Sequence, residues 1–489
     1  MPLRLYNTRT RRVEPLRPLE PDHVRIYVCG LTPSAEGHLG HARSFLFFDV
    51  LRRYLEHPRN GYRLTFVKNV TDIDDRSIAT AEREGTTFDA VMARHYASFR
   101  ASMAKLGVRQ PDHEPFATGY VPQIVEMIGE LMERGYAYAT GDGVYYRVAA
   151  FARYGALSGK NVDELLIGAR IAENEQKDDP LDFALWKFAK PGEPRWDSPW
   201  GAGRPGWHIE CSAMSRALLG VPFDIHGGGY DLIFPHHENE IAQSEPLMDA
   251  PPMAEMWVHS GLLNFDGRKM SKSLGNFEPL SALLERHDPF AIRLLFLQTG
   301  YRKPMNFTED AIAGAETALE KLVNSYRRAQ RAELEPAVPG RTVREPSAYR
   351  ETIFERLDDD MNTAGALGVL FDFAADLVRY TDLGLRDEGL KLMREVFALF
   401  GLEPALDREF RVEFDEAFVD RLRARLSDLL VVNGAASPEA AIEAVIEARK
   451  AARQGKDFAL SDRLRDALVA VGVRLNDSKD GTTWIRTGA

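Results

Sequence analysis

Residues 24–41 read Val-Arg-Ile-Tyr-Val-Cys-Gly-Leu-Thr-Pro-Ser-Ala-Glu-Gly-His-Leu-Gly-His. The apolar run at 24–28 predicts a buried strand, and a helix is expected from about residue 42. The loop between them carries one thiol, Cys29, and two imidazoles, His38 and His41, around Gly40. Ligands of open α/β sheets bind at the carboxyl ends of strands, and helix amino-termini attract anions. The stretch therefore predicts a place where a metal and a phosphate bind side by side.

The composition is that of an ordinary globular protein with several domains. At 489 residues the chain exceeds a single core, so two to four domains are expected. Because no apolar run approaches the ~20 residues of a membrane span and no signal peptide is visible, we expect a cytoplasmic protein that binds no membrane. The net charge of −11 argues against DNA binding, and two cysteines are too few for a disulfide scaffold.

The order of predicted elements indicates an α/β fold with a Rossmann-like parallel sheet. The predicted strands are 24–28, 64–67, 223–226 and 257–260, with a helix at 44–55 and a glycine turn at 227–231. The expected domains are a catalytic domain in two halves (1–111 and 201–287), a connective insertion (112–200), an α-helical region with a bundle (288–404) and a small mixed α/β C-terminal domain (405–489).

Four scattered side chains suggest a metal site. Pro-His-His-Glu-Asn-Glu at 235–240 predicts a helix on which His236 and Glu240 share a face. Cys211 lies near the start of another predicted helix, and Cys29 ends a predicted strand. Two thiolates, one imidazole and one carboxylate make a tetrahedral zinc set. On spacing alone, a solvated His–Glu pair and two buried structural thiols remain the alternative.

A second group of residues suits a nucleotide. The glycines before Asp231 let the backbone approach a ligand closely, and Asp231 can accept from ribose hydroxyls. Lys269 and Lys272 lie in a glycine-bracketed loop that suits a clamp on a polyphosphate. Taken singly, the glycines make a simple turn and the lysines a solvated basic loop. No Gly-x-x-x-x-Gly-Lys-[Ser/Thr] is present, so this is not a P-loop protein.

His38-Leu39-Gly40-His41, followed far downstream by Lys269-Met270-Ser271-Lys272-Ser273, resembles the paired signatures of class I aminoacyl-tRNA synthetases. The segments 27–32, 206–214 and 234–240 resemble the cysteinyl-tRNA synthetase family in particular, and the resemblance covers essentially the whole chain. Two positions depart from the pattern: Leu39 stands where the signature has isoleucine, and Phe458 stands where the family often has tryptophan.

The resemblance implies ATP-dependent activation of L-cysteine and its transfer to the terminal adenosine of tRNA(Cys), by a monomer, with Mg²⁺ accompanying ATP. It implies one zinc ion, held by Cys29, Cys211, His236 and Glu240, that binds the substrate thiolate. Four protein ligands normally close a structural zinc site, so the substrate sulfur must enter as an added ligand.

The resemblance also assigns roles residue by residue. It implies that Thr32 and Thr71 contact the substrate backbone and that Trp207 and His226 form walls of the cysteine pocket. ATP contacts fall to Gly40, Gly229, Asp231 and Lys272. His38, His41, Lys269 and Lys272 are expected to stabilise charge on pyrophosphate in the transition state. Anticodon contacts in the C-terminal domain fall to Arg453, Phe458, Asp462, Asp477 and Trp484, with the two aromatic rings stacking on bases.

Two other functions remain open. A paralogue that joins activated cysteine to an amino sugar, as in mycothiol biosynthesis, would share the zinc and nucleotide motifs but lack a tRNA-reading terminal domain. A non-catalytic RNA-binding or zinc-structural protein is the second alternative, and the lysine loop together with both histidines speaks against it.

Overall fold

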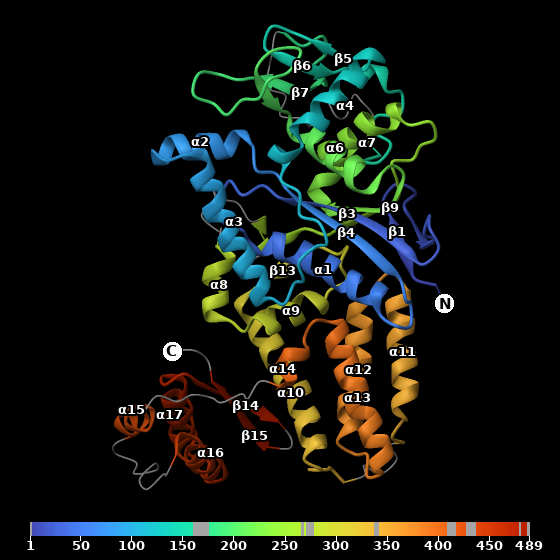
Figure 1. Ribbon diagram of the computed structural model, residues 1–489. Coiled ribbons are helices and arrows are strands. Elements are labelled where there is room, and N and C mark those ends of the chain that lie inside the picture. The colour runs from blue at the N-terminus through green and yellow to red at the C-terminus, as the bar shows by residue number, and fades with distance from the viewer. Residues whose placement is uncertain are drawn as a thin grey trace. The chain divides into compact units, whose positions relative to one another are not determined.

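A computed structural model describes residues 2–159, 176–265, 268–269, 278–336, 342–407, 417–426, 437–478 and 481–486 (Figure 1). The chain forms two compact units, residues 1–406 and 407–489. In the part of the chain that is described, no helix has the length and apolarity needed to span a bilayer. Predictions for Lys272, and for the rest of the loop at 270–277, lie outside the described residues.

The centre of the first unit is a parallel sheet in the order β10-β9-β3-β4. Its strands are β3 (His23–Leu31), β4 (Arg63–Val70), β9 (Phe223–Gly229) and β10 (Ala254–Ser260). The predicted α/β class is therefore confirmed. The chain runs outward from β3 to β4 and later returns to add β9 on the other side of β3. This reversal is a switch point, where the carboxyl ends of β3 and β9 part and form a crevice for ligands.

Strand β3 is buried on both faces, and its side chains alternate between two cores. Val24, Ile26 and Val28 pack with helix α1 (Leu39–Glu56) in one cluster. Tyr27 and Cys29 face the other cluster, which includes helix α6 (Trp207–Leu219). The two helices thus cover opposite faces of the sheet (Figure 1). Because side chains alternate along a strand, Cys29 must point toward the α6 side.

The predicted glycine turn at 227–231 is wrong. Gly227, Gly228 and Gly229 continue β9 and pair with residues 258–260 of β10, and the short 3₁₀ helix Tyr230–Leu232 follows. A Cβ on Gly227 would lie 2.3 Å from Phe48 Cζ, and a Cβ on Gly228 would lie 2.9 Å from His237 Cε1. The glycines are there because an aromatic ring and an imidazole press against the strand, which sequence patterning does not reveal.

The remaining elements of the first unit surround this sheet. The hairpin β1 (Arg4–Asn7) and β2 (Arg12–Pro15) precedes it, and α2 (Asp75–Glu84) and α3 (Phe88–Lys105) follow β4. Between β4 and β9 the chain forms α4 (Val121–Glu133) and an antiparallel sheet of β5 (Ala137–Ala139), β6 (Gly143–Tyr146), β7 (Phe183–Phe188) and β8 (Gly203–Pro205). A π-helical turn at Ile233–His237 leads into α7 (Glu238–Ser244), which lies before β10.

After β10 a three-stranded sheet contains β11 (Leu263–Phe265), β12 (Arg268–Lys269) and β13 (Met305–Phe307). Helices α8 (Leu280–Arg286) and α9 (Pro289–Leu297) lie between β12 and β13 along the chain. The predicted bundle consists of α10 (Glu309–Gln330), α11 (Pro346–Asp358), α12 (Thr363–Leu377), α13 (Leu383–Leu399) and the short α14 (Glu403–Asp407). The second unit contains α15 (Phe418–Arg425), α16 (Pro438–Gln454), α17 (Phe458–Val469) and the hairpin β14 (Val473–Ser478) and β15 (Gly481–Arg486), with its own core.

Candidate active site

The four predicted metal ligands meet at one point of the crevice. Cys29 lies near the carboxyl end of β3, Cys211 lies in α6, and His236 and Glu240 lie on either side of the junction between the turn Ile233–His237 and α7. Cys29 Sγ lies 3.7 Å from Cys211 Sγ and 3.3 Å from Glu240 Oε1, and His236 Nε2 lies 3.1 Å from Glu240 Oε1. All four side chains are buried, and one donor atom from each falls within 4.8 Å of the others.

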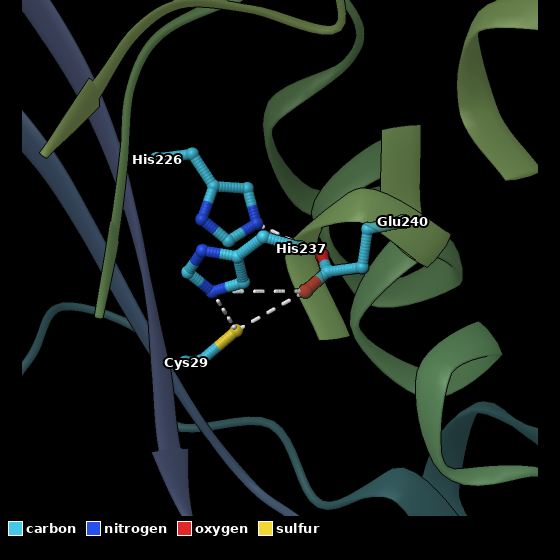
Figure 2. A group of neighbouring side chains, drawn as sticks. All are labelled: Cys29, His226, His237 and Glu240. Carbon is cyan, nitrogen blue, oxygen red and sulfur yellow. Dashed lines mark hydrogen bonds and ion pairs between the residues drawn. The ribbon is translucent and has the colours of Figure 1, made fainter. Parts of the chain in front are cut away.

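A second donor group overlaps the first. Cys29 and Glu240 also lie close to His226 and His237, and one donor atom from each of these four residues lies within 4.8 Å of the others (Figure 2). His237 Nε2 lies 3.3 Å from Cys29 Sγ, and His226 Nε2 lies 2.8 Å from Glu240 Oε2. The sequence prediction missed His237 as a candidate ligand and placed His226 in the amino-acid pocket. The signal was available, because His237 precedes Glu240 by three positions and such residues also neighbour each other on a helix, but the prediction used only the i,i+4 spacing of His236.

Each candidate imidazole ligand on the π-helical turn is oriented by another imidazole. His236 Nδ1 lies 2.9 Å from His208 Nδ1, and His237 Nδ1 lies 2.7 Å from His259 Nε2. The hydrogen-bond series that starts at His237 continues from His259 to the Thr8 hydroxyl, which lies 2.7 Å from His259 Nδ1. Metal-bound histidines usually hold their other ring nitrogen in such a hydrogen bond, so both donor groups have the support that a metal site needs.

The protonation states of these groups follow from burial and mutual charge. Burial alone raises the pKa of Cys211, but the hydrogen bond from Cys29 and the charge of His236 lower it to about 6. Burial, and then Cys211, raise the pKa of Cys29 well above its ordinary value. Burial opposes ionisation of Glu240, yet the charges of His226 and His236 hold its pKa well below the usual range. The pocket therefore carries anionic donors, as a cation site requires.

A cavity of about 910 Å³ opens beside the donor groups. Of the predicted site residues it is lined by Cys29, Thr32, His38, Gly40, His41, Trp207, Gly229 and Asp231. The cavity thus extends from a candidate metal ligand to both signature histidines. Thr71 and His226 do not line it: Thr71 accepts a hydrogen bond from Asn69 Nδ2 at 3.2 Å, and His226 stacks on Trp257 with ring centroids 4.4 Å apart.

The two signature histidines form the amino-terminal cap of α1. His38 Nδ1 accepts from the Gly40 amide at 3.1 Å, His41 Nδ1 accepts from the His38 amide at 3.3 Å, and the rings stack with centroids 3.8 Å apart. Burial, and then the charge of His38, hold the pKa of His41 well below its ordinary value. Helix α1 begins at Leu39 rather than near 42 because His38 supplies this cap. In the neutral rings the proton lies on Nε2, so only Nε2 can donate to a phosphate.

The other predicted residues lie in β12 and in the second unit. Lys269 belongs to β12, where its backbone pairs with Asn264 of β11. In the second unit, Phe458 begins α17 with 64% of its surface exposed, Arg453 lies in the last turn of α16, and Asp477 lies in β14. Asp462 pairs with Arg465 at 3.1 Å, and Trp484 Nε1 donates to Glu443 Oε1 at 3.0 Å.

Residues 15–317 match the family described as the tRNA synthetases class I (C) catalytic domain, and residues 353–402 match the DALR domain. Among solved structures, Mycobacterium tuberculosis methionyl-tRNA synthetase bound by methionyl-adenylate is similar, with a TM-score of 0.58 and 16% identity, covering 78% of this chain and 92% of that one. The Agrobacterium radiobacter LeuRS–tRNA–LeuAMS complex also has a TM-score of 0.58, at 12% identity, covering 80% and 85%. The fold is that of a class I aminoacyl-tRNA synthetase.

Curated relatives show which family of class I aminoacyl-tRNA synthetases the chain belongs to. The chain is 46% identical over 483 residues to the cysteine–tRNA ligase of Pseudomonas paraeruginosa, and 44% identical over 485 residues to that of Pseudomonas aeruginosa. A cysteine–tRNA ligase of Desulfotalea psychrophila is 44% identical over 497 residues, and each match covers 99% of both chains. The chain therefore belongs to the cysteine–tRNA ligase family, and the resemblance to that family stated from its motifs is confirmed.

Proposed function

We propose that the protein activates L-cysteine with ATP and transfers it to the 3'-terminal adenosine of tRNA(Cys), acting in the cytoplasm as a monomer with Mg²⁺ accompanying ATP. One observation carries this proposal. Cys29, a member of the buried soft-donor group, lines the same cavity as His38 and His41. A thiol-selecting centre and a phosphate-binding helix terminus therefore face one shared space, as cysteine activation requires.

The metal that fits the donor group is zinc. Two thiols, an imidazole and a carboxylate form a donor set typical of Zn²⁺. Ligands held tetrahedrally about 2.3 Å from zinc lie about 3.8 Å apart, and the Cys29 and Cys211 sulfurs are 3.7 Å apart. We therefore propose Cys29, Cys211, His236 and Glu240 as the ligands. When bound, zinc supplies a soft Lewis acid that holds a thiolate in preference to a hydroxyl.

The side chains around the cavity bind and orient the substrates. Trp207 stacks on His236 with centroids 4.4 Å apart and forms one wall beside the donor group. Gly229 and Asp231 lie at the end of β9, where they can contact a ribose, and Thr32 follows β3. The Nε2–H groups of His38 and His41 can donate to phosphate oxygens. With Lys269 and Lys272 they would stabilise charge as pyrophosphate leaves, without a protein nucleophile.

The second unit is proposed to read the anticodon. Phe458 is an exposed aromatic side chain at the start of α17, as stacking on an unpaired base requires. The unit also favours a tRNA over an amino sugar as the acceptor. The curated relatives named cysteine–tRNA ligase match 99% of this chain, which includes residues 407–489.

The proposal is tested by measuring zinc content together with amino-acid-dependent ATP–pyrophosphate exchange. We expect about one zinc ion per chain, robust exchange with cysteine and negligible exchange with serine. An apolar pocket alone separates such near-isosteres by only roughly 100-fold. Comparable exchange with both amino acids would refute the proposed role of the metal in selecting the thiol. The absence of cysteine-dependent exchange would refute the proposed enzymatic function.

A further inference from the structure

Arg43 is buried on the same helix as the signature histidines, two residues after His41, and it does not face the cavity. Its guanidinium donates to four backbone carbonyls from two separate segments. Nη1 donates to Gly261 O at 3.1 Å and Leu262 O at 2.7 Å, and Nη2 donates to Gly300 O at 3.4 Å and Lys303 O at 2.5 Å. The side chain is only 3% exposed. A planar fork is the one side-chain geometry that can satisfy two carbonyl pairs at once.

The segments that Arg43 holds pack tightly against each other. The Gly261 amide donates to Tyr301 O at 2.7 Å, and the Met305 amide donates to Leu262 O at 3.0 Å. A Cβ on Gly261 would lie 2.6 Å from both Arg302 O and Lys303 O. One turn further along α1, Phe47 stacks on Tyr301 with centroids 4.0 Å apart and planes 9° from parallel. Helix α1 therefore contacts the junction between residues 261–262 and 300–305 through two side chains, Arg43 and Phe47.

The junction lies at the base of the strand pair that contains Lys269. Strand β11 starts directly after Leu262, and its Asn264 pairs with Lys269 of β12. Gly261, Leu262 and Leu263 line the same cavity as His38 and His41. A shift of the junction would therefore move the backbone of Lys269 relative to the capped histidines. Arg43 does not itself line the cavity, so it acts through the segments that it holds.

We propose that Arg43 is a positioning residue that fixes the base of the lysine-bearing β11–β12 pair relative to the signature histidines, and so sets the geometry of pyrophosphate release. This rests on the proposed function, because the signature histidines and Lys269, whose relative positions Arg43 would fix, are the residues proposed to contact the phosphates. Lysine cannot replace Arg43, since a single ammonium cannot bridge both carbonyl pairs. Gly261→Ala should disturb the same junction from the opposite side.

The test compares wild type, Arg43→Lys, Gly261→Ala and the matched control Arg52→Lys. Arg52 lies on the same helix, where it donates to Gln110 O at 2.7 Å and pairs with Glu56 and Asp112. The first readout is hydrogen–deuterium exchange of peptides covering 261–265 and 303–307 in the free protein. We expect about tenfold faster exchange in Arg43→Lys and Gly261→Ala, and no change in the control. Unchanged exchange would overturn the anchoring, whatever reaction the protein catalyses.

The second readout separates positioning from general damage. In Arg43→Lys and Gly261→Ala, kcat for cysteine-dependent ATP–pyrophosphate exchange should fall about 10- to 100-fold. KM for cysteine, zinc content and transfer from preformed cysteinyl-adenylate to tRNA should stay at wild-type values. A parallel loss of all these quantities, or an unchanged kcat, would overturn the positioning role. A wild-type protein that shows no cysteine-dependent exchange would instead refute the proposed function, and the positioning role would fall with it.

Discussion

His236 and His237 are adjacent in sequence and both approach Glu240 Oε1, His237 with its Nε2 at 4.0 Å, but they belong to different donor groups. His236 Nε2 lies 3.1 Å from Glu240 Oε1, whereas His237 Nε2 lies 3.3 Å from Cys29 Sγ. The segment Ile233–His237 is kinked at Phe234, and in the helical backbone that follows, His236 and His237 precede Glu240 by four and three positions, both of which neighbour it on a helix. The i,i+4 spacing thus predicted the His236–Glu240 proximity, but the approach of Cys29 and His226 to His237 and Glu240 depends on the tertiary fold.

Matched substitutions distinguish the two donor groups. We expect His236→Asn to weaken zinc binding by more than about 100-fold, because loss of an outer-shell partner alone costs about 10- to 100-fold. His237→Asn should retain zinc, since the proposed set keeps all four ligands. Zinc content after dialysis against a graded chelator series measures both. Zinc loss in His237→Asn with retention in His236→Asn would assign the metal to the other group.

At the scale of elements, α1 is tied to the helical region by a buried ion pair. Arg293 of α9 is fully buried, pairs with Asp49 of α1, and donates to Leu106 O at 3.0 Å and to Phe400 O. Burial disfavours the charge of Arg293, but Asp49 compensates for part of that cost. The helix that carries the signature histidines is thereby fixed against both α9 and the end of α13.

Removing Arg293 should strongly destabilise the first unit. We expect Arg293→Met to lower the free energy of unfolding by about 3–5 kcal/mol, because it leaves Asp49 buried with a missing partner. The control is Arg302→Met, which removes a half-exposed pair with Asp360 and should cost about 0–1 kcal/mol. Urea unfolding followed by tryptophan fluorescence measures both variants. Equal losses in the two variants would contradict the role assigned to the buried pair.

Helices α11 and α13 are linked by a carboxylate with a strongly shifted pKa. Burial raises the pKa of Glu395, but hydrogen bonds from His57 and Arg350, and their charges, lower it to about 2. A depressed carboxylate pKa stabilises the fold above the unfolded-state value of 4.5 and loses that contribution as pH falls toward 2. The shift would correspond to about 3 kcal/mol, and solvent exposure reduces this to about 1–2 kcal/mol.

Glu395→Gln should therefore lower stability by about 1–2 kcal/mol at pH 7, and the difference from wild type should shrink as pH falls from 4.5 toward 2. Glu388→Gln, at an exposed position on the same helix, is the control and should show little effect at any pH. Denaturant midpoints at a series of pH values measure this. A difference that persists unchanged at low pH would contradict the assignment.

At the scale of the whole molecule, the chain is two compact units, residues 1–406 and 407–489. The candidate metal ligands and the cavity lie in the first unit, and the proposed anticodon contacts lie in the second. Each unit has its own hydrophobic core.

A chain ending at Leu406 should keep cysteine-dependent ATP–pyrophosphate exchange and lose tRNA charging. Two stacked aromatic side chains contribute about 1–3 kcal/mol each, so kcat/KM for charging should fall at least about 30-fold. Phe458→Ala in the full chain is the companion variant and should lower charging alone. Charging that survives truncation would exclude anticodon reading by the second unit.

Local sequence patterns predict the α/β class, the main strands and both signature histidines, and the family resemblance implies the four residues proposed for zinc. Strand alternation, helix periodicity and motif spacing are local properties, so they can be read from neighbouring residues. The folded structure was needed to show that Gly227–Gly229 form a strand against Phe48 and His237, that His237 lies beside Cys29, and that Arg43 bridges two distant segments. Those features depend on contacts between residues up to 260 positions apart, and no local pattern records which distant groups come together.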